Sequence, residues 1–490
     1  MLILEIHPNS PLSIFQQIVG QLVRMIEAGQ LKKGERLPAT RELAKKLGIN
    51  RSTVVRAYEE LWALGYVESQ MGGYTYVRER KQIVKRHSFD EQSAFPATAV
   101  FCRGNKMKDL NAEKYTSMQE ERDEGFVDMR MLEPDYRLID RNKFKTITRE
   151  LLSDKTINPF SYSSPLGYEP LRKALLKQMQ LHQVHAQLDN IMISNGTQHS
   201  LHLIFQAYTK PGDCIAIESP SYSMIIPLLR YYKLDVVDVP VLDDGPDLEQ
   251  FKKEVKQRKI HLFYTMPTFQ NPTGVTMPQQ KREELLDICY ANGVVIIEDS
   301  IEEEMKFFDK VHLPIKSMDR KGMVIYLGSF AKVLAPGMRV SWIVAHPLAI
   351  QQLSGLHRIF DLSGNTFIQM VMQRFLEGGH YERHLRKLTR AFRSRMELSF
   401  ELLKSLSEPK LIRWKEPLGG YLIWVQLLTR QLPQDPESYF KEFGVRVSDG
   451  RKFFFTPVSR SYVLLSIAKC NEEEIREGLE SFAKAVGQLA

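Results

Sequence analysis

Short runs of β-branched and aromatic residues alternate with helical patterns over residues 125–490, and this alternation limits the folds open to the chain. The runs include IMIS, CIAIES, HLFYTMP, VVIIED and MVIYLGS. Strands at such intervals, joined by crossover helices, predict an α/β domain with a mostly parallel sheet. Ligands on such sheets bind at the carboxyl ends of the strands, where polar residues come after several of these runs.

One apolar run, residues 324–327, ends at Gly328 and Ser329 and is followed by Lys332, with Arg339 seven positions further on. A lysine held in an apolar pocket loses solvation, so a neutral amine becomes available for Schiff-base chemistry. Most lysines after strands are solvated surface residues, so this interpretation depends on the residues at the ends of the other strands.

Four more strand ends carry polar or aromatic residues. The turn 196–198 opens a helix, where backbone amides and a hydroxyl suit a phosphate, and Tyr222 comes after CIAIES. Asn271 lies in a turn after HLFYTMP, and Asp299 ends VVIIED. Singly, each is more often a turn former, a core ring or a helix cap. Together with Lys332 they provide the phosphate cradle, stacking ring, hydroxyl donor, carboxylate and amine that suit pyridoxal 5′-phosphate.

Nearly all of residues 125–490 resemble the fold-type I aminotransferases, through the motifs YSSPLGYEPLRKAL, SNGTQHSL, ESPSY, MPTFQNPTGV, EDS and GSFAKVLAPGMR. The resemblance implies that Lys332 is the Schiff-base lysine and that Asp299 keeps the pyridine nitrogen protonated. It also implies that Asn271 bonds the ring hydroxyl and that Tyr222 stacks on the ring. The phosphate ligands that it implies are Gly196, Thr197, Gln198, Ser329, Arg339 and, from the neighbouring subunit, Tyr162.

The first 79 residues have a different organisation, with helical patterns at residues 14–28, 41–47 and 51–64. Thr40 and Asn50 are placed to cap the second and third helices. Two short helices joined at a glycine predict a helix-turn-helix, and YVESQMGGYTYV predicts a hairpin wing. The buried stripe expected for the third helix is Val54, Tyr58, Leu61 and Leu64.

Residues 11–77 resemble the winged helix-turn-helix of GntR-type bacterial regulators. The DNA contacts that this resemblance implies are Arg41, Arg51, Ser52, Thr53 and Gly73. Arg56 is added because it lies on the exposed face of the third helix. Residues 1–87 hold 14 Lys and Arg against 8 Asp and Glu, whereas the remaining residues hold 53 against 51. This excess of positive charge predicts double-stranded DNA as a partner, although it also fits a solvated basic face.

The predicted domains are residues 1–79, a polar linker over residues 80–124 and residues 125–490. This layout resembles the MocR-type regulators, which implies a domain-swapped, head-to-tail homodimer that senses a small molecule through the cofactor. The sequence has no apolar run of membrane-spanning length and no signal peptide, so we expect a cytoplasmic protein without a membrane partner. The four cysteines lie far apart, so no metal site is expected.

The sequence departs from the aminotransferase pattern at three sites. Ile301 and Glu302 stand where a tyrosine bonds the ring hydroxyl, and Leu464 stands where an arginine clamps the substrate carboxylate. Ala331 replaces a common serine, which is a smaller change. Arg446 and Arg460 are candidates to replace the missing clamp.

These observations leave three hypotheses. The leading one is a transcriptional regulator that senses an amine or amino acid through Lys332, with an aminotransferase fold used as a sensor. A second is a catalytically active aminotransferase that carries a DNA-binding domain. A third makes pyridoxal phosphate itself the effector.

Overall fold

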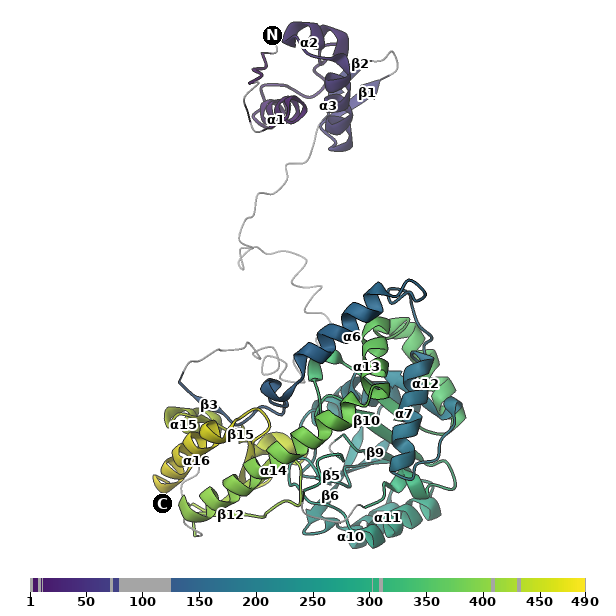
Figure 1. The fold of residues 1–490 in the computed structure, drawn as a ribbon, viewed down its shortest axis with the longest axis vertical. Helices are drawn as coiled ribbons and strands as arrows, with labels where there is room; N and C mark the ends of the chain where they lie inside the picture. Colours follow the sequence, from purple (N-terminus) through teal and green to yellow (C-terminus); the bar gives the residue numbers. More distant parts are fainter. Residues whose placement is uncertain are drawn as a thin grey trace. The chain divides into compact units, whose positions relative to one another are not determined.

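The computed structural model describes residues 3–7, 10, 12–70, 74–78, 125–301, 303–307, 312–406, 410–429 and 433–489. The chain divides into two compact units, Met1–Gly104 and Asn105–Ala490, which are described separately (Figure 1). The predicted linker, residues 80–124, lies outside the described residues, and the domain boundaries at 79 and 125 stay predictions.

Three helices and a hairpin form the first unit, as the sequence predicts. Its elements are α1 (Ile14–Glu27), α2 (Thr40–Leu47), α3 (Arg51–Ala63), β1 (Val67–Gln70) and β2 (Tyr74–Val77). Strands β1 and β2 pair antiparallel. The helices enclose a small core in which Ile18, Leu22, Val54 and Leu61 are fully buried.

Two details of these helices differ from the expectation. Thr40 is the first residue of α2 and Ala39 is its N-cap, so the Thr40 side chain caps nothing. Leu64 is the C-cap residue beyond the end of α3 at Ala63, and it is 40% exposed. Asn50 caps α3 as predicted, accepting a hydrogen bond of 3.0 Å from the Ser52 amide.

An eight-stranded sheet forms the centre of the second unit, in the order β4-β11-β10-β9-β8-β5-β6-β7. Strands β5, β6, β8, β9 and β10 run parallel to their neighbours within this group, and β11 and β7 are antiparallel. The strands are β4 (Ile191–Ser194), β5 (Cys214–Ser219), β6 (Asp235–Leu242), β7 (Gly245–Pro246), β8 (Ile260–Thr265), β9 (Val295–Asp299), β10 (Val324–Ser329) and β11 (Ser341–Val344). The mostly parallel α/β sheet is therefore confirmed.

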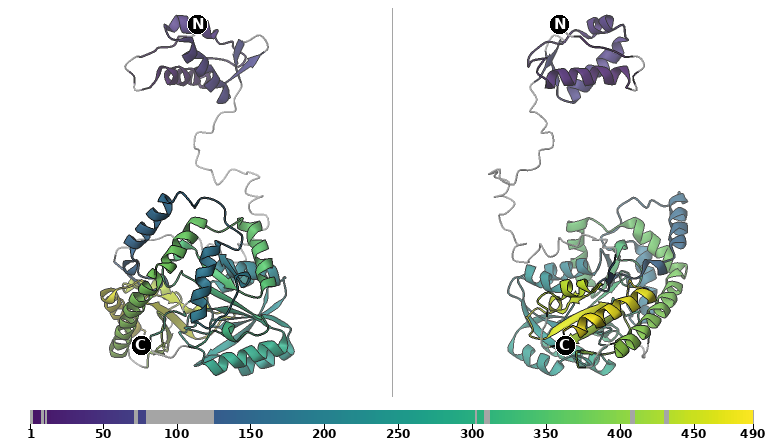
Figure 2. Two further views of the ribbon diagram at one scale, coloured as in Figure 1. Left: turned by 45° about the vertical axis from the view of Figure 1, so that its right-hand side comes forward. Right: turned by 90° about the vertical axis from the view of Figure 1, so that its left-hand side faces the viewer.

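Helices cover both faces of this sheet (Figures 1 and 2). Successive residues of one strand enter different cores: Ile296 belongs to one buried cluster with Phe251 of α10 (Leu248–Gln257), whereas Ile297 belongs to another with Ile204 of α8 (Thr197–Tyr208). Buried residues on both faces explain the continuous apolar runs in the sequence. The helices are α6 (Arg141–Ser153), α7 (Glu169–Leu181), α8 (Thr197–Tyr208), α9 (Ile225–Tyr231), α10 (Leu248–Gln257), α11 (Gln279–Asn292), α12 (Pro347–Asp361), α13 (Thr366–Glu377) and α14 (His380–Leu406).

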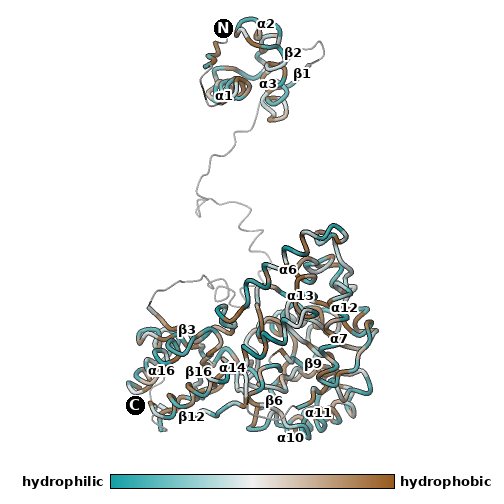
Figure 3. Tube along the Cα trace, viewed as in Figure 1, coloured by the Kyte–Doolittle hydropathy of each residue, from teal (hydrophilic) through white to brown (hydrophobic). Residues whose placement is uncertain are grey.

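The C-terminal part adds a smaller antiparallel sheet, β12 (Ile412–Trp414), β13 (Leu422–Leu427), β16 (Ser461–Ser466) and β15 (Ser448–Asp449). The strand β3 (Val127–Asp128) pairs in parallel with β14 (Val445–Arg446). The first described strand of this unit therefore lies beside a strand near its C-terminus. The last helices are α15 (Pro436–Glu442) and α16 (Glu472–Gly487). Apolar and polar residues alternate along α14, as a helix with one buried face requires (Figure 3). No helix in the described part of the chain is long and apolar enough to cross a membrane.

Candidate functional site

The strand ends singled out in the sequence meet at one edge of the large sheet. Leu327 of β10 pairs with Asp299 at the end of β9. Ser329 pairs with Ser341 of β11, which pairs in turn with Ser194 at the end of β4. Lys332 comes directly after β10, and its Nζ donates a hydrogen bond of 3.1 Å to a backbone carbonyl, that of Leu132. The predicted cofactor residues from these strands therefore converge.

Asp299 is fully buried, and its two carboxylate oxygens differ. Oδ2 accepts a hydrogen bond of 2.7 Å from the Tyr264 hydroxyl, whereas Oδ1 has no hydrogen-bond partner. Burial raises the pKa of Asp299 to about 6, although Tyr264 and Lys332 oppose that rise. The orphaned Oδ1 fits the protonated nitrogen of a pyridine ring, which would satisfy both the charge and the hydrogen bond.

Tyr264 was missed by sequence reasoning. It lies within β8, in a run that reads as a core strand, and it reaches Asp299 because β8 pairs with β9. The only sign of its role in the sequence is its place in a largely apolar strand. The neighbouring strand ends in Asp299.

Asn271 is also fully buried, and neither its Oδ1 nor its Nδ2 has a hydrogen-bond partner. Gln270 fixes the turn around it, because its Oε1 accepts from the Thr273 amide at 3.1 Å and its Nε2 donates to the Pro220 carbonyl at 2.7 Å. Buried amides are rarely left unpaired, so this side chain is arranged for a ligand. Tyr222 lies two residues after Pro220, whose carbonyl Gln270 binds, and burial and the charge of Asp299 raise the pKa of Tyr222 to about 12.

A second set of predicted residues surrounds the start of α8. Gly196 has φ +99°, and a Cβ there would collide with the Arg339 guanidinium, so only glycine fits. Arg339 Nη2 donates to the Asn195 carbonyl at 2.9 Å. Gln198 Nε2 donates to the Met224 carbonyl at 2.9 Å, whereas its Oε1 is buried without a partner. This helix N-terminus with a guanidinium beside it suits a phosphate.

Tyr162 is not buried within one chain, where it is 80% exposed. Its neighbour Phe160 is 82% exposed. Both lie on the segment between α6 and α7.

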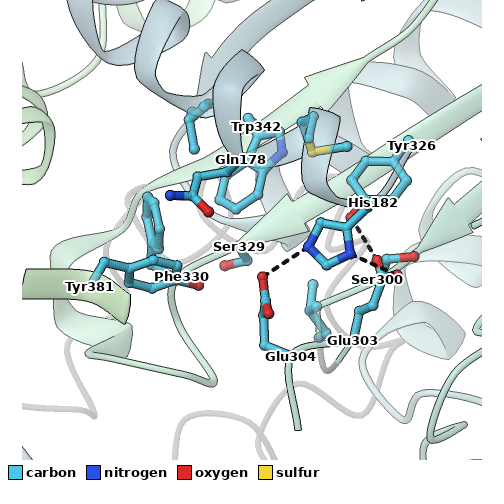
Figure 4. Close-up of a pocket in the computed structure, with 13 residues that line it drawn as sticks. Gln178, His182, Ser300, Glu303, Glu304, Tyr326, Ser329, Phe330, Trp342 and Tyr381 are labelled. Carbon is cyan, nitrogen blue, oxygen red and sulfur yellow. Dashed lines mark hydrogen bonds and ion pairs between the residues drawn. The ribbon is translucent and has the colours of Figure 1, made fainter. Parts of the chain in front are cut away.

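The loop after Asp299 is held by a cluster that the sequence did not predict (Figure 4). His182 lies between two carboxylates, with Nδ1 3.3 Å from Glu303 and Nε2 3.1 Å from Glu304. The Tyr326 hydroxyl donates to Glu303 at 3.1 Å. Burial alone would lower the pKa of His182, but the hydrogen bonds of Glu303 and Glu304 raise it to about 10.

Beside this cluster lies the position of the tyrosine in the aminotransferase pattern. Ile301 is buried and lines the same pocket as His182 and Glu303, while Glu302 lies outside the described residues. Between Asp299 and the anchored Glu303, the described side chains include no aromatic ring.

Leu464 is buried in β16, opposite Trp424 of β13. Arg446 lies in β14 beside Asp128, where it and Arg130 help to lower the pKa of Asp128 against the effect of burial. Arg460 is exposed. A replacement clamp by Arg446 or Arg460 stays a prediction, and the position of Leu464 itself is apolar.

A separate group of His199, His357 and Asp361 has metal-ligand chemistry. His199 Nε2 lies 2.9 Å from Asp361 Oδ2, and His357 Nε2 lies 3.8 Å from it. However, His199 Nδ1 accepts a hydrogen bond from the Asn195 amide, so a neutral His199 carries its proton on Nε2. That nitrogen then has no lone pair for a metal, and the group instead braces the turn at Asn195.

In the first unit, Arg41, Arg51 and Ser52 are exposed near the start of α2 or α3. The Arg56 guanidinium lies 4.7 Å from the centre of the Phe15 ring, so part of its role is to pack α3 on α1. Gly73 lies outside the described residues. Arg36, which the sequence did not suggest, lies over Tyr74 at the turn end of the hairpin.

Residues 137–482 match the family model of aminotransferase class I and II, and residues 14–77 match that of the bacterial regulatory proteins, gntR family. An aromatic-amino-acid aminotransferase 1 of Thermococcus litoralis is 32% identical over 356 residues, which cover 69% of this chain and 83% of that protein. The uncharacterized HTH-type transcriptional regulator YdfD of Bacillus subtilis is 26% identical over 478 residues, 97% of each chain. The solved structure of Pyrococcus horikoshii kynurenine aminotransferase aligns with a TM-score of 0.72 and 27% identity, covering 82% of this chain and 98% of that one.

Proposed function

This chain belongs to the aminotransferase class I and II family and carries a gntR-type winged helix-turn-helix before that domain, and we propose that it is a DNA-binding transcriptional regulator that senses a small molecule. One observation carries the proposal: a relative named as an HTH-type transcriptional regulator matches 97% of this chain, across both domains. The aminotransferase match covers only the later part.

Pyridoxal 5′-phosphate is the cofactor of the large domain. Asp299 would hold its ring nitrogen, Asn271 its ring hydroxyl, Tyr222 its ring face, and the turn at Gly196 with Arg339 its phosphate. Three of these residues or turns present buried polar atoms without partners, namely Asp299 Oδ1, both amide atoms of Asn271 and Gln198 Oε1. When bound, the cofactor supplies an electrophilic carbon that reacts with the amine of Lys332 or of a ligand.

The active form is proposed to be a head-to-tail, domain-swapped homodimer of the MocR type. Phe160 and Tyr162 support it, because two large aromatic side chains this exposed are typical of a surface that a second copy covers. Tyr162 then completes the phosphate site of the partner. The dimer binds double-stranded DNA in the cytoplasm through the exposed ends of α2 and α3.

A working aminotransferase is the second candidate. The completeness of the cofactor site favours it, whereas buried Leu464 at the position of the carboxylate clamp disfavours it. A third candidate is that pyridoxal phosphate itself is the signal.

The deciding experiment measures the affinity of the full-length protein for duplexes from its own promoter region, with and without pyridoxal phosphate and with a panel of amines and amino acids. A regulator changes its affinity with cofactor or ligand, and the Lys332→Ala variant loses that response. If no duplex is bound specifically in any state, the proposal is wrong.

A further inference from the structure

One face of the small antiparallel sheet is turned toward the cofactor site. Tyr421, just before β13, packs against Phe392 of α14, with ring centres 6.0 Å apart. Neighbouring positions of a strand point to opposite sides, and Trp424, three positions from Tyr421, packs instead against Phe453 at 5.5 Å. The Phe453 carbonyl accepts a hydrogen bond of 2.8 Å from the Ser221 amide, next to Tyr222. The Trp424 side of the sheet therefore borders the site.

A second contact reaches the site from the other direction. Ser466 of β16 shares its face with Trp424, because it pairs with Leu422, two positions from Trp424. Its hydroxyl donates to the Met131 carbonyl at 2.8 Å. The next carbonyl in the chain, that of Leu132, accepts the hydrogen bond from Lys332 Nζ.

Leu464 lies between these two contacts. It pairs with Trp424 on one side and with Ser448 on the other, and only 1% of it is exposed. Tyr462 lies beyond it, stacked on Trp424 with ring centres 5.0 Å apart and planes 11° apart. On β13, β15 and β16 this face holds no lysine or arginine: its residues there are Leu422, Trp424, Gln426, Ser448, Tyr462, Leu464 and Ser466. Arg413 of β12 shares the face, opposite Gln426, but is exposed and lies two strands from Leu464.

Two guanidinium groups near the site already bind other groups. Arg339 donates to the Asn195 carbonyl at the phosphate turn. Arg130 makes two hydrogen bonds to Asp128, of 3.0 and 2.8 Å. A ligand carboxylate placed against Leu464 would lose its water without gaining a charged partner from β13, β15 or β16, whereas an apolar body would gain contact with the partly exposed rings of Trp424 and Tyr462.

This inference rests on the proposed function and names its ligand class. We propose that the effector is a primary amine with an aromatic or similarly apolar body and no carboxylate beside the amine. Trp424 and Tyr462 contact the body, and Leu464 makes the wall uncharged where a carboxylate would need an arginine.

The test uses full-length protein loaded with pyridoxal phosphate and titrated with 2-phenylethylamine, L-phenylalanine and methylamine. The first two differ only by the carboxylate, and methylamine lacks the apolar body. The visible absorption of the cofactor reports binding, and the affinity for promoter DNA reports the response. We expect 2-phenylethylamine to bind at least about tenfold more tightly than either of the others. Equal or tighter binding of phenylalanine, or equal binding of methylamine, would overturn the assignment.

Two variants test whether Trp424 and Leu464 contact the ligand. Trp424→Ala should weaken 2-phenylethylamine about tenfold and leave methylamine unchanged. Leu464→Arg should improve phenylalanine binding at least about tenfold, with Leu464→Met as the uncharged control of similar volume. If the Leu464→Arg variant does not fold, Trp424→Ala decides alone, and an unchanged 2-phenylethylamine affinity in that variant refutes the proposal. If the DNA affinity of the cofactor-loaded protein responds to phenylalanine, only this inference is refuted. If the protein neither loads the cofactor nor binds DNA, the proposed function itself is refuted.

Discussion

The hydroxyl of Tyr264 donates a 2.7 Å hydrogen bond to Asp299, so a strand residue controls the charge of the carboxylate that faces the cofactor. Hydrogen bonds that favour the ionised form lower a carboxyl pKa, and the Asp299 pKa would rise further above about 6 without Tyr264. This pair makes cofactor affinity depend on pH, because only ionised Asp299 can stabilise a protonated pyridine.

Tyr264→Phe should therefore weaken pyridoxal phosphate binding by roughly 1.5–3 kcal/mol, the value of a hydrogen bond to a charged group. The affinity of the native protein should fall as pH drops through about 6, and that fall should begin at higher pH in the variant. Absorbance titrations between pH 5 and 8 measure both effects. Tyr290→Phe, which removes a tyrosine bonded to Asp319 instead, is the matched control. Identical pH profiles for the native and Tyr264→Phe proteins would contradict the assigned role.

Asp299→Asn should separate stability from binding. The pKa of Asp299 is raised in the folded protein above its ordinary value of 3.8, so its contribution to stability is present below pH 3.8 and is lost as pH rises through about 6. The cofactor-free variant should thus be more stable than the native protein at pH 7, by about 3 kcal/mol at roughly 1.4 kcal/mol per pKa unit. Urea unfolding of the cofactor-free proteins measures this difference, and the variant should bind cofactor poorly. A variant less stable than the native protein at pH 7 would show that the ionised carboxylate stabilises the fold.

Removing His182 tests the loop after Asp299. The pKa of His182 is raised to about 10, so its stabilising effect is complete below its ordinary pKa of 6.5 and disappears as pH rises through about 10. His182→Gln leaves buried Glu303 without its main cationic neighbour, and we expect a loss of about 3 kcal/mol at pH 7. The loss should shrink toward pH 10, as urea unfolding at several pH values would show.

Glu304→Gln is the control for this cluster, because the Glu304 side chain is 30% exposed and the Glu303 side chain only 3%. It should destabilise less than His182→Gln at every pH. A pH-independent effect of His182→Gln would mean that packing, and not charge, holds the loop.

The order of the strands explains how much of this site could be predicted. Asp299, Ser329 and the turn at Gly196 each end a strand, and parallel strands bring their carboxyl ends to one edge, so local patterns sufficed. Tyr264 lies inside a strand, where alternation indicates only core. His182 reaches Glu303 through tertiary packing of α7, which no local pattern records.

Helix ends were less predictable for a different reason. Thr40 is a good capping residue, but Ala39 adopts the extended backbone of the N-cap and Thr40 begins the helix. Leu64 continues the apolar spacing of α3, yet Gly65 takes a positive φ of 75° and ends the helical path. In both cases the adjacent turn decides where the helix ends.

Arg51 should contribute to DNA binding from the exposed start of α3. If it contacts a base edge, Arg51→Ala should weaken specific binding by roughly 1–3 kcal/mol and relax sequence preference at one position. Affinity should fall steeply with salt, because phosphate contacts release counterions. Fluorescence anisotropy with promoter and scrambled duplexes measures both effects, with Arg24→Ala on α1 as the charge-matched control. Equal losses for the two variants would reduce Arg51 to a general electrostatic role.

The last prediction is that the protein turns over common α-amino acids poorly. The position of the carboxylate clamp holds buried Leu464, and the residues of β13, β15 and β16 on the same face are uncharged. A missing bidentate pair forfeits charge-assisted hydrogen bonds of roughly 1.5–3 kcal/mol each. It also removes the orientation that aligns the Cα–H bond for proton transfer, so the rate should fall as well as the affinity. A sensor requires only that its ligand bind two conformations with different affinity.

Transamination assays with several amino acids and a keto acid, at saturating pyridoxal phosphate, measure this turnover directly. Rapid multiple turnover with any of them would restore the enzyme hypothesis, and Leu464→Arg should raise turnover if the missing clamp is the cause.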